Sequence, residues 1–221
     1  MSKILIIATH PDDETLGCGG TILRHIANKD KVYWLIATKM KNKKKWKENK
    51  INLRKNEILS VYKKFKFSKK YELDFETSYL DSIPIGEIIH KLNKVVIDCK
   101  PDIVYCPNID DVHTDHQIIS KACSGLAKSF RFNFIKRILT YEVISETNYN
   151  FFNNEEFKPN YFVNIQNYLK QKIEIMKIYK SEMKKFPFPR SVEAIEALAK
   201  IRGAQSNLKA AEAFKIIKEI Y

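Results

Sequence analysis

The sequence contains no apolar run that approaches the roughly 20 residues of a membrane-spanning helix. Its apolar segment at 3–9 is too short for the hydrophobic core of a signal peptide, and His10 and Pro11 follow at once. The four cysteines form no CxxC pair and are too sparse for a disulfide scaffold. We therefore expect a cytoplasmic protein without a membrane span, in a compartment that keeps thiols reduced.

Acidic residues are also scarce, since 26 Asp and Glu against 39 Lys and Arg give a formal net charge of +13. Such a surplus can indicate a nucleic acid, an anionic membrane or an acidic substrate as the partner. Most of it is lysine, notably in KMKNKKKWKENK at 39–50, whereas nucleic-acid readers favour arginine with interleaved aromatic residues. We interpret the lysines as a solvated surface and expect no nucleic-acid partner. A basic nucleic-acid-binding protein is the alternative, and its binding would depend steeply on salt.

The 221 residues, 44% of them hydrophobic, suffice for a sizeable core, and we expect a single domain over 1–221. Continuous apolar runs predict buried strands, and apolar residues at helical spacing predict helices. The predicted strands lie at 3–9, 31–38, 71–75, 102–107 and 137–143, and the stretch 144–165 is irregular. The predicted helices lie at 15–30, entered through a glycine-rich turn, at 46–65 and 86–99, after residue 116, and at 166–183, 191–203 and 209–220. This alternation predicts an α/β fold with a parallel sheet.

His10, Pro11 and three adjacent acidic residues, Asp12, Asp13 and Glu14, follow the first predicted strand directly. Adjacent carboxylates repel one another and proline cannot extend a sheet, so the arrangement is destabilising unless a positive charge lies among them. A metal ion would supply that charge. One of the first two carboxylates could bind the ion while the other serves as a base. Glu14 more simply begins the following helix, where the helix dipole favours it.

A second group of metal-ligand residue types, DDVHTDH at 110–116, follows the fourth predicted strand, with His113 and His116 three residues apart. Ligands of open α/β sheets bind outside the carboxyl ends of the strands, so the two loops would meet if their strands are neighbours. A hydrolytic zinc site requires three nitrogen or oxygen ligands and an open position for a water whose pKa falls to roughly 7. The two motifs together therefore predict a metal-dependent hydrolase.

Each motif also has a purely structural interpretation. A His-Pro-Asp sequence is commonly just a turn, and in HTDH either Thr114 or Asp115 could cap a helix and leave both histidines exposed. The occurrence of both motifs at equivalent strand ends is what favours a site. Cys18 has no evident activating partner and is expected to be a small buried residue rather than a nucleophile.

With these motifs the sequence resembles the PIG-L (LmbE-like) deacetylases, metal-dependent enzymes that remove the acetyl group from N-acetylglucosamine groups. The segments that carry the resemblance span nearly the whole chain and are HPDDE, GCGGTI, LRKNE, HTDH, YEVISET, FPRSVEAIEALAKIRG and AEAF. The resemblance implies a Rossmann-like three-layer α/β fold with a mostly parallel central sheet. It also implies one divalent metal ion, Zn²⁺ in the first place and Fe²⁺ as the alternative, and a small-molecule amino-sugar substrate.

The resemblance further assigns roles to residues of the two motifs. The metal ligands that it implies are His10, Asp13 and His116. It makes Asp12 the general base, and it makes His113 the group that stabilises the oxyanion, as an imidazolium, or protonates the leaving amine. Arg54 would bind the substrate, and an ion pair with Glu57 on the same helix is the competing interpretation.

Further expectations concern the reaction, the loops that contact the substrate, the oligomeric state and two arginines. Metal-dependent hydrolysis of another amide or ester is the alternative reaction. We expect the loops at 40–50 and 144–160 to set which carrier group of the amino sugar is accepted. A homo-oligomer is compatible with the sequence. Arg190 and Arg202, near the C-terminus, are interpreted as structural residues.

Overall fold

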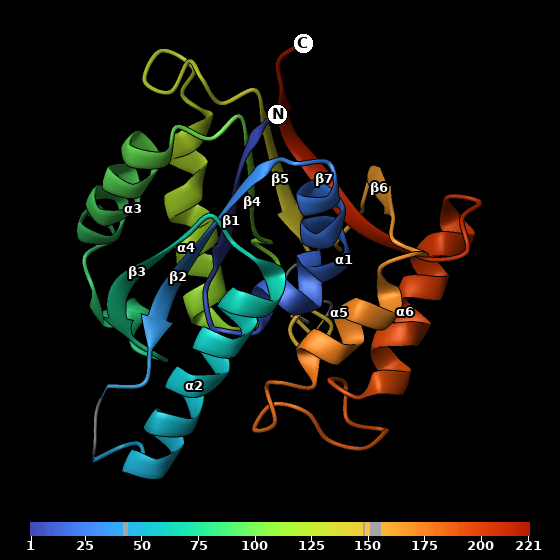
Figure 1. Ribbon diagram of the computed structural model, residues 1–221. Helices are drawn as coiled ribbons and strands as arrows, with labels where there is room; N and C mark the ends of the chain where they lie inside the picture. Colours follow the sequence, from blue (N-terminus) through green and yellow to red (C-terminus); the bar gives the residue numbers. More distant parts are fainter. Residues whose placement is uncertain (42–43, 148, 151–155) are drawn as a thin grey trace.

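The computed structural model describes residues 1–41, 44–147, 149–150 and 156–221. In this described part of the chain, seven strands form one sheet in the order β3-β2-β1-β4-β5-β7-β6 (Figure 1). Their bounds are β1 Lys3–Ala8, β2 Lys31–Lys39, β3 Lys69–Glu76, β4 Ile103–Pro107, β5 Arg137–Tyr141, β6 Tyr161–Asn164 and β7 Ala211–Glu219. The first five strands are parallel, and β7 lies antiparallel between β5 and β6. The predicted α/β fold with a mostly parallel sheet is confirmed.

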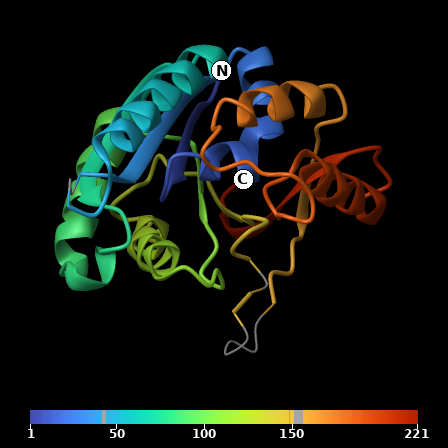
Figure 2. The ribbon, with the colours of Figure 1, turned by 90° about the horizontal axis from the view of Figure 1, so that it is seen from below.

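Helices cover both faces of this sheet and give the fold three layers (Figures 1 and 2). Among the described residues the α-helices are α1 Asp13–Ala27, α2 Glu48–Phe65, α3 Ile85–Cys99, α4 Thr114–Ser124, α5 Leu169–Met176 and α6 Val192–Gln205. Short 3₁₀ turns lie at Leu80–Ser82 and Gly125–Ala127. Side chains of α1, α2, α5 and α6 belong to the core on one face, and those of α3 and α4 belong to the core on the other.

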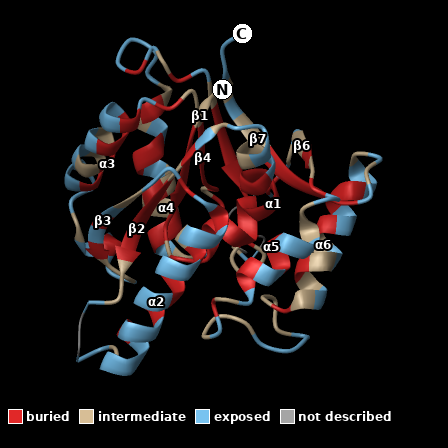
Figure 3. Cartoon of the chain, in the orientation of Figure 1, coloured by how far each residue is buried: buried red, intermediate tan, exposed pale blue. Residues whose placement is uncertain are grey.

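Strand β1 contributes to both cores because its side chains alternate between the two faces of the sheet. Ile4 and Ile6 belong to the core that α1 and α2 cover, whereas Leu5 and Ile7 belong to the core that α3 and α4 cover. Figure 3 shows the buried strands between helices whose outer surfaces are exposed. A strand that is buried on both faces requires an unbroken apolar run, which is why the sequence predicts β1 to within one residue.

The C-terminal segment is a strand, and the helix predicted at 209–220 is wrong. Strand β7 pairs with β5 and β6 and buries Ala211, Ala213 and Phe214. Alanine, lysine and glutamate favour a helix when the segment is considered alone, but pairing with two neighbouring strands outweighs that propensity. Strand β6 also lies within the stretch 144–165 that was predicted to be irregular.

The glycines of GCGG lie inside α1, so the predicted glycine-rich turn before the helix is also wrong. They allow α1 to approach its neighbours closely. A Cβ atom at Gly17 would overlap the ring of Tyr141, and one at Gly20 would lie 2.6 Å from Ile165. Helix α1 therefore begins at Asp13, almost directly after β1.

The other predicted elements are confirmed within a few residues, except that the helix predicted at 166–183 is limited to α5. In the described residues, no helix combines the length and the apolar character needed to cross a membrane.

Candidate metal centre and active site

Strands β1 and β4 are neighbours in the sheet and pair in parallel, so their carboxyl ends meet at the same edge. His10 lies in the loop after β1, and Asp13 is the first residue of α1. His116 lies in the first turn of α4, which follows the loop after β4. The structure thus brings together the two motifs at the position where open α/β sheets bind their ligands.

The side chains of the three predicted metal ligands converge at this edge. His10 Nδ1 lies 3.1 Å from His116 Nε2. Asp13 Oδ2 lies 3.3 Å from His116 Nε2 and 3.9 Å from His10 Nδ1. Two donors of one tetrahedral ion at zinc–nitrogen distance would lie about 3.4 Å apart. The separations and the chemistry of the donors therefore fit a single divalent ion.

A carboxylate orients each of the two histidines. His10 Nε2 lies 3.0 Å from Asp115 Oδ2, and His116 Nδ1 lies 2.8 Å from Asp111 Oδ2. Each carboxylate accepts the N–H of its ring, which directs the opposite ring nitrogen at the shared centre. Asp115 also accepts two backbone N–H groups, and Asp111 accepts the hydroxyl of Thr147 at 2.6 Å. Both carboxylates are thus held in place themselves.

The orienting roles of these two carboxylates were not predicted from the sequence, although both lie within DDVHTDH. Thr114 and Asp115 were the expected candidates for the helix cap, but the residue that caps α4 is His113, whose Nδ1 accepts the backbone N–H of Asp115. The interpretation with both histidines exposed is wrong for His116, which is buried. A second group of donors, His10, His113 and Asp115, also lies close together. In that group His10 and Asp115 already satisfy each other by a hydrogen bond, so the first group is the better ligand set.

The charges of the candidate ligand residues depend on one another. Burial favours the neutral ring of His116, but the carboxylates of Asp13 and Asp111 raise its pKa well above the usual value. Burial also favours the protonated form of Asp13, yet the charge and the hydrogen bond of His116 hold the pKa of Asp13 well below its usual value. A proton on His116 thus supplies the positive charge among these carboxylates, and a bound cation would displace that proton.

Asp12 lies outside the ligand set, although it is adjacent to Asp13 in sequence. It precedes α1 with a φ of 128°, a conformation that residues other than glycine rarely adopt. Arg190 Nη1 lies 3.8 Å from its carboxylate. Burial, and then the charge of Asp13, raise the pKa of Asp12 to about 8. A carboxyl group with this pKa is suited to exchanging a proton near neutral pH.

His113 borders the same centre, with its ring centroid 4.6 Å from that of His10. Burial, followed by the charges of His10 and His116, lowers the pKa of His113 to about 4. Because Nδ1 accepts the backbone N–H of Asp115 at 3.1 Å, the neutral ring carries its proton on Nε2. The structure therefore favours a neutral N–H donor at this position over the imidazolium that the sequence analysis expected.

Arg54 lies on the wall of the site, and protein groups engage its guanidinium. Nη1 donates to the carbonyl oxygen of Pro11 at 2.7 Å, Nη2 contacts Glu182, and Nε lies 3.4 Å from Glu57 Oε2. The ion pair with Glu57 is therefore present, and both of its members are buried. These contacts fix Arg54 against the turn that carries Asp12, and its contact with a substrate stays a prediction.

A cavity of about 250 Å³, here called the site cavity, opens over this centre. Its wall includes residues beyond the predicted site residues, namely Met40, Trp46, Lys50, Thr77, Glu146, Glu182 and Arg190. Four of them lie in the two loops, 40–50 and 144–160, that the sequence predicts to set the carrier group. Thr77 and Glu182 had no predicted role, and Arg190 was interpreted as a structural residue. Arg190 pairs with Glu182 at 3.2 Å and approaches Asp12, so it is part of the site. Arg202, in contrast, forms a buried ion pair with Glu142, as expected of a structural residue.

Part of the lysine-rich segment 39–50 borders the site cavity through Trp46 and Lys50. The Nε1 of Trp46 donates to Glu76 at 3.1 Å, and the amino group of Lys50 lies 4.8 Å from the centroid of the Trp46 ring. Lys43, which the sequence analysis counted in the solvated surface, lies outside the described residues. The segment is therefore more than a solvated surface.

Comparison with known proteins gives one family match and several similar folds. Residues 5–127 match the model of the PIG-L family, which is described as GlcNAc-PI de-N-acetylase. A conserved protein from Thermus thermophilus is 24% identical with a TM-score of 0.77, and the match covers 100% of this chain and 97% of that one. The N,N'-diacetylchitobiose deacetylase from Pyrococcus horikoshii, in complex with an inhibitor, is 20% identical with a TM-score of 0.77, over 98% and 84% of the two chains. The 4-carboxy-2-hydroxymuconate hydratase from Pseudomonas putida is 13% identical with a TM-score of 0.73, over 100% and 98%.

Proposed function

The chain belongs to the PIG-L family, and from this premise we propose that it is a metal-dependent deacetylase that removes the N-acetyl group from an amino sugar of the N-acetylglucosamine type. The observation that carries the proposal is the convergence of two imidazole nitrogens and one carboxylate oxygen beside a separate, buried carboxyl group. His10, Asp13 and His116 are the residues that would hold the ion, with Zn²⁺ and Fe²⁺ as the candidates. A divalent cation bound there would polarise the amide carbonyl and lower the pKa of a water.

The neighbouring residues divide the proton transfers between them. Asp12 accepts a proton from the attacking water as the oxygen bonds to the carbonyl carbon, and it delivers that proton to the nitrogen as the carbon–nitrogen bond breaks. His113 donates the N–H of Nε2 to the carbonyl oxygen, on which negative charge develops. The products are acetate and the free amine. The charges of Arg54 and then of Arg190 favour the ionised form of Asp12 and so oppose the effect of burial on its pKa.

The wall of the site cavity supports a sugar as the substrate. Trp46 offers an aromatic surface, and Lys50 and Arg190 offer donors at the same cavity. The Pyrococcus horikoshii deacetylase, whose name describes action on a diacetylated amino sugar, shares the fold over almost the whole chain. Both points favour an acetylated amino sugar over an unrelated amide or ester.

The similarity to a hydratase favours a second candidate, the addition of water to a double bond. This reaction would use the same activation of water but would release neither amine nor acetate. Release of both products from N-acetylglucosamine conjugates, together with metal analysis, therefore tests the proposal. Conversion of unsaturated acids without any amine release would favour the second candidate instead.

The three ligand variants, His10→Ala, Asp13→Ala and His116→Ala, test the metal centre. Each should lose most of the bound metal and nearly all activity, because a site with three protein ligands rarely survives the loss of one. Metal content is measured on the purified proteins by elemental analysis. Near-stoichiometric metal in all three variants would contradict the assignment.

The variants Asp12→Asn and Asp13→Asn test how the adjacent carboxylates divide the roles. Asp12→Asn should keep its metal, its fold and its substrate binding, while turnover falls by roughly 10²–10⁴, the usual contribution of a positioned general base. Asp13→Asn should lose activity because it binds the metal weakly, so that added metal partly restores activity. If Asp12→Asn lost its metal while Asp13→Asn stayed loaded but slow, the two roles would be exchanged.

A further inference from the structure

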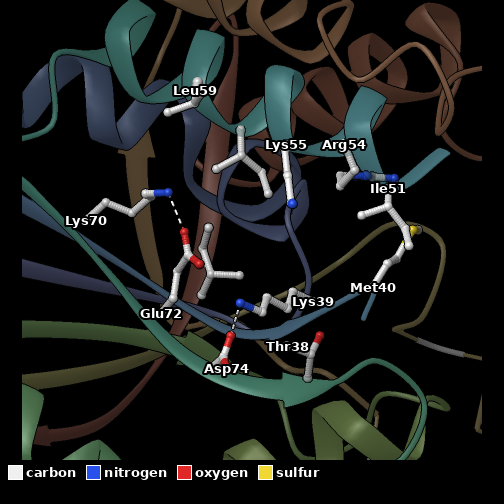
Figure 4. Close-up of a pocket in the computed structure, with 12 residues that line it drawn as sticks. Thr38, Lys39, Met40, Ile51, Arg54, Lys55, Leu59, Lys70, Glu72 and Asp74 are labelled. Carbon is white, nitrogen blue, oxygen red and sulfur yellow. Dashed lines mark hydrogen bonds and ion pairs between the residues drawn. The ribbon is translucent and has the colours of Figure 1, made fainter. Parts of the chain in front are cut away.

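A second cavity of about 250 Å³, here called the α2 groove, lies between α2 and the strands β2 and β3 (Figure 4). β3 is an edge strand, and its alternating residues Lys70, Glu72 and Asp74 line the groove. Apolar side chains from β2, from the residue that follows it and from α2 complete the wall: Ile36, Met40, Ile51, Ile58 and Leu59. The groove thus combines an apolar bed along α2 with a charged margin along β3.

The charges of this margin are largely paired with one another. Lys70 pairs with Glu72, and Asp74 pairs with both Lys39 and Lys41. Lys55 of α2 is different, because no hydrogen bond or ion pair links it to any residue in the described part of the chain. Figure 4 shows its amino group pointing into the groove. The groove therefore presents a lysine without a partner among the described residues, Lys55, beside an apolar bed.

The α2 groove adjoins the site cavity. Met40 and Arg54 line both cavities, and Figure 4 shows them with Ile51 at one end of the groove, away from Lys70. Arg54 is held by its contacts with Pro11 and two carboxylates, whereas the unbranched side chain of Met40 can adjust to a neighbour. A molecule that extends from the site cavity past Met40 would enter the groove.

We propose that the α2 groove binds the group that carries the amino sugar, and that this carrier has an apolar segment with an anionic group that meets Lys55. The inference rests on the proposed function, because it extends the same substrate out of the site cavity. The apolar bed accounts for the apolar segment, since each fully buried methylene group strengthens binding about fourfold. The unpaired lysine accounts for the anionic group, and a partly exposed ion pair strengthens binding up to about fivefold.

Binding of deacetylated glycosides, the products of the proposed reaction, tests the groove without turnover. Isothermal titration calorimetry compares four glucosaminides, with methyl, octyl, 8-carboxyoctyl and 8-phosphooctyl groups as the carriers. We expect the octyl glycoside to bind more than about tenfold more tightly than the methyl glycoside, as two buried methylene groups would give. At least one of the two anionic glycosides should bind about threefold more tightly than the octyl glycoside, and the preferred one identifies a carboxylate or a phosphate as the natural anion.

Two variants separate the apolar and the charged contributions. Lys55→Ala should remove the preference for the anionic glycoside and keep the preference for octyl over methyl. Leu59→Asp, at a half-exposed position of the groove wall, should reduce the preference for octyl. Lys63→Ala is the matched control, because Lys63 is an exposed lysine of the same helix that lines neither cavity, and it should change no ratio.

Equal binding of the methyl and octyl glycosides would overturn the proposal, and so would equal effects of Lys55→Ala and Lys63→Ala. Amine release from methyl N-acetylglucosaminide tests the proposed function separately, because a methyl group is too short to reach the groove. Turnover of that substrate without preferential binding of the octyl glycoside would contradict only the proposed role of the groove. Preferential binding of the octyl glycoside without any turnover would contradict the proposed deacetylase activity and leave the groove as a binding site.

Discussion

Asp12 and Asp13 are adjacent carboxyl groups with opposite electrostatic surroundings. Asp13 faces His116 and His10, which stabilise its charge, whereas Asp12 faces the charge of Asp13 from a buried position. The sequence predicts that one carboxylate binds metal and the other acts as a base, because repulsion between neighbours has to be relieved. It does not distinguish the two residues, since the distinction comes from the backbone at Asp12, whose φ of 128° turns the chain between them.

The raised pKa of Asp12 predicts how the stability of the chelator-treated protein depends on pH. The folded pKa of about 8 lies above the unfolded value of about 3.9, so between these values the folded state holds a proton that the unfolded state has released. Raising the pH through this window therefore favours unfolding. Asp12→Asn cannot titrate, and its free energy of unfolding should rise relative to wild type by roughly 1–3 kcal/mol between pH 6 and pH 8.

Urea unfolding of both chelator-treated proteins at the two pH values measures this difference. The comparison between variant and wild type removes the contributions of His116 and Asp13, which titrate in both. A gap that stays constant from pH 6 to pH 8 would mean that Asp12 ionises normally in the folded protein, and would remove the electrostatic reason for assigning it as the base.

At the scale of the elements, burial decides which segments the sequence predicts correctly. Strands such as β1 and β4 are buried on both faces and carry unbroken apolar runs, and their prediction is accurate. β7 combines buried alanines with lysines and glutamates, a composition typical of helices, and its strand conformation depends on partners far away in the sequence. The glycines of α1 were wrongly predicted to form a turn for a related reason. Their role is to let Tyr141 and Ile165 pack closely against the helix, and these residues are distant in the sequence.

The packing of α1 predicts opposite effects for two helical glycines. Gly20→Ala places a methyl group 2.6 Å from Ile165 in the core and should lower the free energy of unfolding by about 1–3 kcal/mol. Gly86→Ala, in α3, meets nothing within 4 Å, so stability should be unchanged or rise by up to about 1 kcal/mol. Denaturant unfolding of both variants measures the difference. Equal effects would mean that the glycines of α1 are not required for close packing.

At the scale of the whole molecule, the site is assembled from segments that are distant in sequence. The two motifs meet because β4 inserts beside β1 in the sheet, which the strand order decides. Other residues of the site cavity come from the lysine-rich segment, from α2, from the segments that follow β3 and β5, and from the segment around Arg190. The sequence predicts the candidate ligand residues, which the structure brings together, because their chemistry is concentrated in two short motifs. It gives Glu182 and Arg190 no role at the site because nothing local distinguishes them from other polar residues. Trp46 lies in the loop 40–50, which was expected to contact the carrier group.

This assembly predicts how metal removal affects the stability of the whole fold. A cation held by His10, Asp13 and His116 would tie the loop after β1 to α4, and it would bind the folded state preferentially because the unfolded chain keeps His116 far from the other two residues. Binding at 100 times the dissociation constant stabilises a protein by about 2.7 kcal/mol, which corresponds to about 5–10 °C in Tm for a chain of this size. Treatment with a chelator should therefore lower the Tm of the metal-loaded protein by that amount, measured by calorimetry. Asp13→Asn, which lacks one ligand, should begin with the lower Tm and should not respond to the chelator. An equal response of the variant and the wild type would show that the stabilising cation binds at some other place in the molecule.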